Sequence, residues 1–413
     1  MAQTTAAPAA PTTPVPGRLG YQPALDGVRA LAISLVVLFH YPWKSPFYRF
    51  NPVHGGFLGV DVFFVLSGFL ITTLLLQEHA ALGAVSLRRF YARRALRLLP
   101  AFFVLFAIAL FLHFTLAAGD GNRPEVLGLF GMVFYAANWV NVYRDGALGV
   151  VSHTWSLAIE EQFYVVWPLI LVLLLRRRLR LVTIAGITTA GIVAASVWRA
   201  WYWLHHLGHR NFLDYYLDVT SRPLPSGTVG TLTHRTEVWN RFYFGSDTRA
   251  DALLVGCLTA IVLFWLLPRL GARSRVRLSA AACLALVGCA VIVWQSVVVI
   301  SGWLPVWGIL ALELAVGVVI AGLVAAPRNP LARLLALPPL AWLGRRSYAV
   351  YLFHTVVFEY CRRSRVHLSP PVSFVFQMVV ILVVAELSHR LVEAPMLRRK
   401  QHFEPPVPVA AST

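Results

Sequence analysis

Residues 25–40 read LDGVRALAISLVVLFH, an apolar run with Asp26 and Arg29 near its start and His40 at its end. Titratable side chains inside a membrane helix are costly, so they usually face a polar interior and have a function. On a helix, Asp26 and Arg29 can share one face, and His40 lies three turns beyond Arg29 on that face. His40 also titrates near neutral pH, which suits proton transfer. The run therefore predicts a first membrane helix with a functional polar face; a structural histidine at the outer interface is the alternative.

The composition indicates that the rest of the chain also lies in a membrane. Of its 413 residues, 58% are hydrophobic and 13% are charged, and the mean hydropathy is +0.67. Soluble domains are nearer to half apolar and a quarter charged, so we predict a polytopic membrane protein with the lipid bilayer as a partner. The net charge of +18 fits basic cytoplasmic loops better than a nucleic-acid footprint, and no nucleic-acid partner is expected. The cysteines show no CxxC spacing, so neither a disulfide framework nor a metal site is predicted.

Ten apolar stretches are long enough to cross a bilayer. They lie near residues 25–41, 57–77, 98–118, 154–175, 181–199, 251–268, 279–300, 306–326, 340–360 and 373–393. A further stretch, 126–140, is short for a span. We predict an all-α polytopic membrane protein with about ten transmembrane helices plus a short interfacial or re-entrant helix.

The distribution of arginine decides how 126–140 is interpreted. If the N-terminus is cytoplasmic and 126–140 does not cross, the basic clusters fall in cytoplasmic loops, as the positive-inside rule requires. These clusters are Arg88, Arg89, Arg93, Arg94 and Arg97; Arg176, Arg177, Arg178 and Arg180; Arg269, Arg273, Arg275 and Arg277; and Arg398, Arg399 and Lys400. One external loop disagrees, with Arg362, Arg363 and Arg365. We expect a plasma-membrane protein with both termini cytoplasmic.

The membrane domain is predicted over residues 21–397, between disordered cytoplasmic tails at 1–20 and 398–413. No cleavable signal peptide is evident. The longest external segment, roughly 200–250, contains a Pro/Gly-rich run at 223–230 that is typical of an irregular loop. Its aromatic side chains could stack on sugar rings, although an interfacial aromatic belt is the commoner interpretation; they are Trp201, Tyr202, Trp203, Tyr215 and Tyr216.

Carboxylates are expected near the outer level of His40. Asp61 lies in the run GGFLGVDVFFVLSG (55–68), and it could orient the His40 imidazole or only cross-link helices. Glu160 and Glu161 lie in HTWSLAIEEQFY (153–164), which opens the fourth span. Two carboxylates entering a membrane are costly, which favours a function for them. Either could pair with His40 or with an arginine.

A basic stripe lies at the opposite, cytoplasmic level. Arg89, Arg93 and Arg97 are spaced by four residues, and Arg94 lies beside them. Guanidinium groups bind phosphate oxygens in pairs, so the stripe could hold a polyphosphate ligand. A loop that merely sets the orientation accounts for part of this signal.

Further polar residues complete a predicted polar interior. The run GRRSYAVYLFH (344–354) carries Arg345, Ser347, Tyr348 and His354, and DTRADALLVGC (247–257) carries Arg249 and Asp251. Singly, each could form a helix-packing ion pair. Together they suggest basic residues at the inner level, with carboxylates and histidine at the outer level.

These motifs, in order, resemble acyltransferase family 3, the ten-helix integral membrane acyltransferases. The resemblance rests on seven segments, residues 25–40, 59–72, 88–100, 153–168, 247–257, 344–354 and VEAP at 392–395. Larger members carry a fused extracytoplasmic hydrolase-like (SGNH) domain, which we do not find here.

The resemblance implies transfer of an acyl group, with acetyl expected, from cytoplasmic acyl-CoA to an acceptor hydroxyl. The arginine stripe would hold the phosphates of CoA. The fifteen residues from Leu25 to His40 span about 22 Å, roughly the length of a pantetheine arm. His40 would act as general base or become acylated itself, and Asp61, Glu160 or Glu161 would set its tautomer; the sequence does not choose between these routes.

The acceptor is expected to be a cell-surface glycan, with a small metabolite such as a macrolide as the alternative. A proton-coupled transporter is the rival class, although no paired discontinuous helices in two matching halves are visible. The sequence leaves the oligomeric state open.

Overall fold

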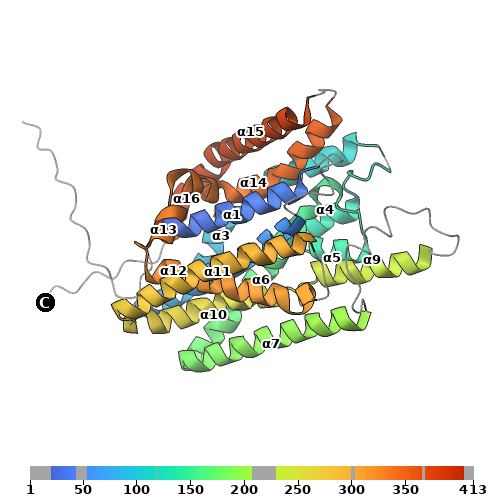
Figure 1. The fold of residues 1–413 in the computed structure, drawn as a ribbon. Helices are drawn as coiled ribbons and strands as arrows, with labels where there is room; N and C mark the ends of the chain where they lie inside the picture. The colour runs from blue at the N-terminus through green and yellow to red at the C-terminus, as the bar shows by residue number, and fades with distance from the viewer. Residues whose placement is uncertain are drawn as a thin grey trace, which may run out of the picture.

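The structure, a computed structural model, describes residues 20–42, 54–117, 119–206, 229–298, 303–364 and 368–403 (Figure 1). Nine helical segments in these ranges are long and apolar enough to cross a membrane, and no strand occurs among the described residues. The segments contain α1 (Pro23–His40), α2 (Gly59–Leu82), α3 (Leu87–Thr115), α6 (Trp155–Arg176), α7 (Leu181–His206), α10 (Ala250–Leu266), α11 (Ala272–Val298), α12 (Ile309–Ala325) and α15 (Pro370–Ser388). The predicted all-α polytopic membrane fold is confirmed.

The tenth predicted span, 340–360, lies in α14 (Pro338–Arg363). At 1.5 Å per residue, its 26 residues extend over about 39 Å, which is enough to cross a bilayer. It falls outside the nine apolar segments, and it carries Arg345 and Arg346 near one end and Arg362 and Arg363 at the other.

The stretch 126–140 forms two short helices, α4 (Val126–Val133) and α5 (Ala137–Tyr143). The chain turns between them at Tyr135, whose φ is 51°, a left-handed conformation. An eight-residue helix extends about 12 Å, so neither helix can span a bilayer. This agrees with the prediction that the stretch does not cross. A short η3 segment (Gly149–Thr154) then leads into α6.

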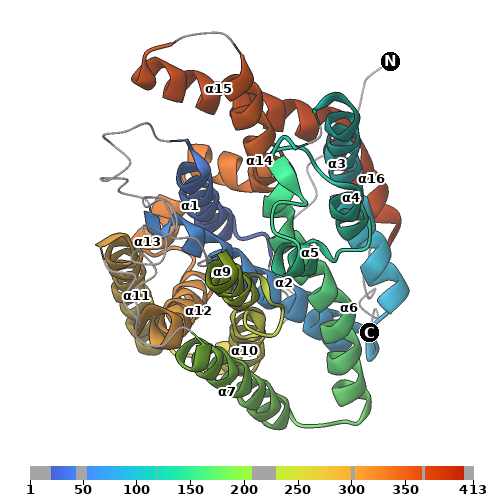
Figure 2. The ribbon, with the colours of Figure 1, turned by 90° about the vertical axis from the view of Figure 1, so that its right-hand side faces the viewer.

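The bundle is arranged around α2, which lies in the middle when viewed along the helices (Figure 2). It contacts α1, α6, α10 and α12. The contact between α2 and α10 is close because each helix offers a glycine to the other. A Cβ at Gly68 would overlap the backbone carbonyl of Leu253, and one at Gly256 would overlap that of Val65. Such small residues are what allow helix backbones to approach within a membrane.

Helices α1 and α14 pack along one another in the same manner. A Cβ at Gly344 of α14 would overlap the backbone of Asp26 in α1. This contact fixes the relative level of the polar residues that the two helices carry, and so it brings the ends that bear His40 and His354 together.

The remaining described elements are short, apart from α9. They are η2 (His54–Leu58), α9 (Val229–Phe244), η4 (Leu267–Arg269), η5 (Leu304–Gly308), α13 (Pro330–Leu335), η6 (His389–Glu393), α16 (Ala394–Arg399) and η7 (Lys400–Phe403). Helical structure thus continues to residue 403 within the segment predicted as a tail. Residues 1–19 and 404–413 of the predicted tails lie outside the described residues, as do 207–228 of the predicted external loop.

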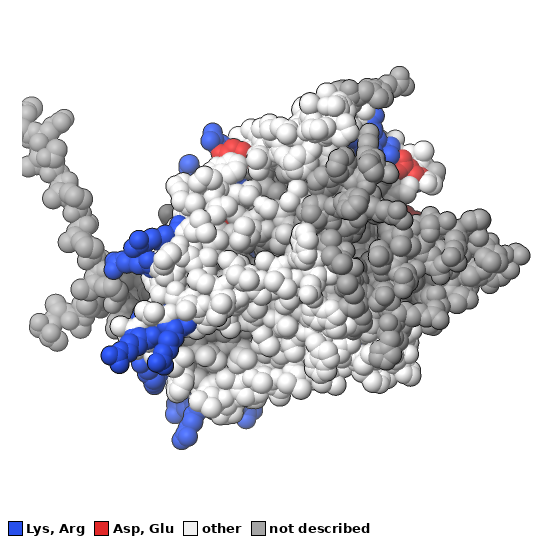
Figure 3. All heavy atoms as spheres, in the orientation of Figure 1, with Lys and Arg blue, Asp and Glu red and all other residues white. Residues whose placement is uncertain are grey.

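Basic side chains gather at one end of the bundle, on the left in Figure 3. The exposed arginines near the end of α6 and the start of α11 include Arg176, Arg177, Arg178, Arg273 and Arg277.

Arg362 and Arg363, the exceptions to the predicted charge pattern, lie at the opposite end of the bundle. Both form ion pairs with carboxylates. Arg362 Nη2 lies 2.7 Å from Glu359, while Arg363 pairs with Glu359 and, at 2.6 Å, with Asp120. This pairing gives a physical reason why these two arginines do not offset the charge asymmetry between the two ends of the bundle. Arg365 lies outside the described residues.

Candidate active site

Three histidines from different parts of the chain meet at the end of the bundle opposite the basic loops. They are His40 at the end of α1, His153 in η3 and His354 in α14. The ring centroid of His354 lies 5.0 Å from that of His40 and 5.1 Å from that of His153. His153 and His354 are buried, whereas His40 is partly exposed. A ligand can therefore reach His40 more readily than the other two.

Two hydrogen bonds determine which ring nitrogens are free. Nδ1 of His40 lies 2.8 Å from the carbonyl oxygen of Val36, and Nδ1 of His354 lies 2.7 Å from that of Tyr351. A carbonyl only accepts, so in each neutral ring Nδ1 carries the proton and Nε2 the lone pair. Nε2 of His354 is buried without a hydrogen-bond partner among the described residues. Two neighbouring rings thus each present a basic nitrogen.

His153 is held differently, because both of its nitrogens are used. Nε2 lies 3.2 Å from the carbonyl oxygen of Leu352, and Nδ1 lies 3.0 Å from the hydroxyl of Thr355. Nε2 is therefore the donor, and Nδ1 accepts from the hydroxyl. The hydroxyl of Tyr351 lies 2.5 Å from the carbonyl of His153, to which it donates. These bonds fasten the start of α6 to α14, which is a structural role.

Beneath the histidines, α6 presents polar side chains at four-residue intervals. Ser156 shares a hydrogen bond of 2.6 Å with the hydroxyl of Tyr351. One turn on, Glu160 accepts from Ser67 at 2.9 Å and from Tyr164 at 3.0 Å. One turn further, the guanidinium of Arg94 lies over the ring of Tyr164, and its Cζ is 3.3 Å from the ring centroid. We call Ser67, Ser156, Glu160, Tyr164, Tyr351 and Arg94 the polar column.

The four arginines of the predicted stripe differ in their carboxylate partners. Glu78 pairs with Arg89 at 3.7 Å and with Arg93 at 3.1 Å. Arg94 lies 3.8 Å from Glu161. Arg97 makes no ion pair within the described ranges, and the residue is exposed. Arg97 is thus the member of the stripe whose charge is most available to an anionic ligand.

The N-terminal parts of α1 and α14 carry several more of the predicted polar residues. Arg29 pairs with Asp26 at 2.7 Å. Tyr21 donates to Asp26 at 2.7 Å and accepts from Arg345 at 3.0 Å. On α14, Ser347 is buried, and the hydroxyl of Tyr348 donates to the carbonyl of Leu98 in α3 at 2.8 Å. Asp26 and Arg29 share one helix face, as their spacing predicts.

The predicted carboxylate partners lie elsewhere than beside His40. Asp61 pairs with Arg249 at 3.1 Å, and both side chains are fully buried. Asp251 pairs with Arg199, which also lies 3.7 Å from Glu313. We call these five residues the buried charge cluster. Among the described residues, the Val36 carbonyl rather than Asp61, Glu160 or Glu161 contacts the His40 ring nitrogen.

Several polar residues of the interior were not assigned from the sequence. Arg199 and Glu313 are single charges inside predicted spans, and that isolation is a signal for a buried pair. His153 and Tyr351 stood inside motifs already quoted, but their contacts depend on how α6 meets α14. Glu393 is buried at the end of a π-helical turn, where the charge of Arg97 acts on it. No group of three or more His, Cys, Asp or Glu side chains in the described ranges is arranged to hold a metal ion.

The fold and this site define an integral membrane protein with an intramembrane histidine site. The family model described as an acyltransferase domain matches residues 22–388. The chain belongs to this family of membrane acyltransferases, as the seven motifs indicate.

Curated relatives agree with this assignment. O-acetyltransferase OatA of Staphylococcus aureus is 30% identical over 403 residues, covering 93% of this chain and 58% of that protein. Peptidoglycan O-acetyltransferase OatA of Listeria monocytogenes is 30% identical over 408 residues, covering 93% of this chain and 56% of that protein. The chain thus spans less than two thirds of the length of these relatives. No solved structure matches it significantly.

Proposed function

We propose that this protein is an O-acyltransferase of the cell membrane that transfers an acetyl group from acetyl-CoA to a hydroxyl of a cell-surface glycan. One observation carries the proposal: the partly exposed His40, whose Nε2 has no hydrogen-bond partner among the described residues, lies beside His354 at one end of the polar column. The family assignment supports acyl transfer as the reaction. The name of the Listeria relative, a peptidoglycan O-acetyltransferase, favours a glycan over a small metabolite as the acceptor.

The donor would enter from the cytoplasmic end. Arg97, which is exposed and has no ion pair in the described part of the chain, and Arg94 beside it would bind the phosphates of CoA. Arg89 and Arg93 are already paired with Glu78, so their part would be smaller. The pantetheine arm would then follow the polar column toward His40. The basic loops at this end support a cytoplasmic orientation of both termini.

At the histidine site, Nε2 of His40 would take the proton of the acceptor hydroxyl as its oxygen attacks the thioester carbonyl. When the tetrahedral intermediate collapses, the C–S bond breaks. His40 then gives the proton to the departing CoA thiolate and returns to its neutral form. The alternative is that His40 first receives the acetyl group and passes it to the acceptor. In either route the Val36 carbonyl holds Nδ1–H and keeps Nε2 directed to the chemistry.

His354 would stabilise the protonated form of His40. Its own Nε2 is an acceptor without a partner in the described part of the chain, and the ring lies next to His40. A proton on Nε2 of His40 could be shared with this lone pair, which would offset the cost of a buried imidazolium. Glu160 and Glu161 would act lower in the column, where they interact with Tyr164 and Arg94.

Replacing His40 tests the proposal. Purified His40→Ala, reconstituted with acetyl-CoA and glycan fragments, should lose roughly 10²–10⁴-fold in acyl transfer, the usual contribution of a general base. Release of free CoA thiol and mass spectrometry of the acceptor give the rate. His113→Ala is the control, because among the described residues its ring meets the Pro124 carbonyl and the Phe114 ring, neither of which belongs to the polar column.

Full transfer by His40→Ala at the wild-type expression level would refute the role of His40. The two routes separate when the wild type is incubated with donor alone and then digested. An acetyl group on the peptide that contains His40 supports the acyl-enzyme, and its absence supports direct transfer.

A further inference from the structure

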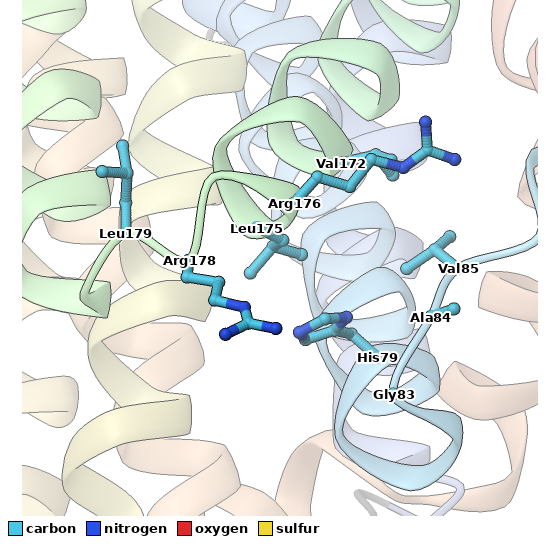
Figure 4. Close-up of a pocket in the computed structure, with 9 residues that line it drawn as sticks. All are labelled: His79, Gly83, Ala84, Val85, Val172, Leu175, Arg176, Arg178 and Leu179. Carbon is cyan, nitrogen blue, oxygen red and sulfur yellow. The ribbon is translucent and has the colours of Figure 1, made fainter.

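A cavity of about 450 Å³ lies at the basic end of the bundle, between the ends of α2 and α6 (Figure 4). Its basic lining residues are His79, Arg176 and Arg178. Val85, Val172 and Leu175 give it an apolar floor. Phe90, Leu76 and Leu175 belong to a hydrophobic cluster that fills the space between α2, α3 and α6. No member of the polar column is among the residues that line the cavity.

Two of the three basic side chains that line the cavity converge, and no acidic residue is among the described lining residues. In Figure 4 the guanidinium of Arg178 and the imidazole of His79 point toward one another, while the guanidinium of Arg176 extends away from them. No Asp or Glu is among the described residues that line the cavity. The adjacent residue of α2 provides the contrast, because Glu78 pairs with Arg89 and Arg93. Two donor groups that face each other across a hollow are favourable when an anion lies between them.

The backbone conformation of Arg178 is a second indication that the cavity holds a ligand. Its φ is 56°, the left-handed conformation in which a helix commonly ends, and glycine is the favoured residue there. The bonds from Arg178 N to the Leu175 carbonyl and from Leu179 N to the Leu174 carbonyl close this turn. A residue other than glycine, asparagine or aspartate is strained in this backbone conformation. The arginine is therefore held in a costly conformation that places its guanidinium over the cavity.

A loop that only orients the protein does not need this arrangement. The positive-inside effect depends on the number of basic residues in a loop, not on where their side chains point. Arg177 and Arg180 of the same loop supply such charge without lining the cavity. The convergence of His79 and Arg178 requires another explanation.

We propose that this cavity binds a phosphate ester. Arg178 donates paired hydrogen bonds to the phosphate oxygens, His79 donates from the opposite side, and the apolar floor receives the adjoining part of the ligand. Two ligands carry this chemistry. One is the headgroup of an anionic phospholipid, since basic pockets at the cytoplasmic ends of membrane helices suit such headgroups. The other is the 3′-phosphate on the adenosine of the CoA donor, with the diphosphate left to Arg94 and Arg97; this ligand rests on the proposed function.

The test compares three variants of the full chain. Arg178→Gly removes the guanidinium and suits the left-handed backbone, so it should fold at least as well as the wild type. His79→Gln removes the imidazole that faces Arg178 across the cavity. Arg177→Ala removes one positive charge from the same loop without touching the cavity, and it is the matched control.

In the lipid arm, each variant is placed in nanodiscs with or without phosphatidylglycerol, and lipid retained after detergent exchange is counted by native mass spectrometry. In the nucleotide arm, adenosine 3′,5′-bisphosphate is titrated by equilibrium dialysis. In the arm that holds the true ligand, Arg178→Gly should bind about 10–100-fold more weakly than wild type, the usual loss for a charge-assisted contact. Arg177→Ala should bind as wild type does.

A selective loss in either arm supports the site and identifies its ligand. Equal binding by Arg178→Gly and Arg177→Ala in both arms overturns the proposal. Neither readout uses acyl transfer, so the cavity can be refuted while the proposed reaction stands, and the reverse also holds.

Discussion

At the scale of single residues, His354 is the side chain whose environment most needs a reason. Its Nε2 is buried and has no partner among the described residues, which is rare for a polar atom in a folded protein. Replacement by asparagine keeps a donor where Nδ1–H meets the Tyr351 carbonyl and removes the free lone pair. We expect His354→Asn to lower kcat by roughly 10–100-fold with little change in the KM for acetyl-CoA.

His153→Asn is the matched comparison for this variant. Both nitrogens of His153 are bonded to neighbouring groups, so its loss should lower the melting temperature more than kcat. Steady-state kinetics and thermal unfolding on both variants separate the two roles. If His354→Asn kept the wild-type kcat, or raised KM alone, His354 would have no part in proton transfer.

The residue scale is also where the sequence was least able to predict partners. The spacing of Asp26 and Arg29 gave their pairing, because both lie on one helix. Asp61 was considered a partner for His40, but the structure pairs it with Arg249. That contact depends on Gly68 and Gly256, which let α2 and α10 approach closely. Periodicity shows which residues share a helix face, whereas the neighbouring helix is set by packing between distant parts of the chain.

At the scale of elements, Asp247 joins α7 and α9 through hydrogen bonds to its carboxylate. It accepts two hydrogen bonds from Arg241 of α9, at 2.5 and 2.6 Å, and one of 2.7 Å from the Trp198 indole of α7. Burial acts to raise the pKa of Asp247, but the hydrogen bonds and charge of Arg241 and the bond from Trp198 outweigh it, so this pKa is lowered. The folded protein therefore binds fewer protons at this group than the unfolded chain does.

Stability should consequently depend on pH through Asp247. A lowered folded-state pKa contributes stability above the unfolded value, near pH 4, and that contribution is lost as the pH falls through the folded value. Asp247→Asn should lower the melting temperature by roughly 1–2 °C at neutral pH and lose less on acidification than the wild type. Thermal unfolding between pH 3 and 7 measures this. Asp145→Asn, at an exposed loop residue, is the control, and identical pH curves for Asp247→Asn and wild type would contradict the assignment.

The membrane helices could be predicted well, because the length of an apolar run can be read directly from the sequence. The stretch 126–140 is the informative case. Its composition alone resembles a span, and only its length and the charge distribution argued against crossing. The structure adds the turn at Tyr135, which divides it into two short helices. The α14 span was predicted as the apolar stretch 340–360, although its charged ends keep it outside the nine most apolar segments in the described part of the chain.

At the scale of the whole molecule, the charge asymmetry and the polar column define one direction through the bundle. Basic loops lie at one end, and the histidines lie at the other. An acyl group carried from a cytoplasmic donor to an external acceptor would need this arrangement. The sequence could predict the two levels, because spans and arginines can be counted. It could not predict that Glu78 and Glu161 would engage three of the four stripe arginines, since those contacts form between helices.

The orientation is testable by labelling single cysteines in a background whose native cysteines are replaced by alanine. Ala84→Cys lies between α2 and α3, Asp145→Cys between α5 and α6, and Ser274→Cys at the start of α11; all three positions are exposed. With cytoplasmic termini and a non-crossing 126–140, an impermeant maleimide on intact cells should label Asp145→Cys alone, and permeabilisation should expose the other two. Labelling of Ser274→Cys but neither Asp145→Cys nor Ala84→Cys would mean that 126–140 crosses the membrane. Labelling of Ala84→Cys and Ser274→Cys without Asp145→Cys would mean that the whole bundle is inverted, which would place Arg97 on the outside and remove the cytoplasmic route proposed for the donor.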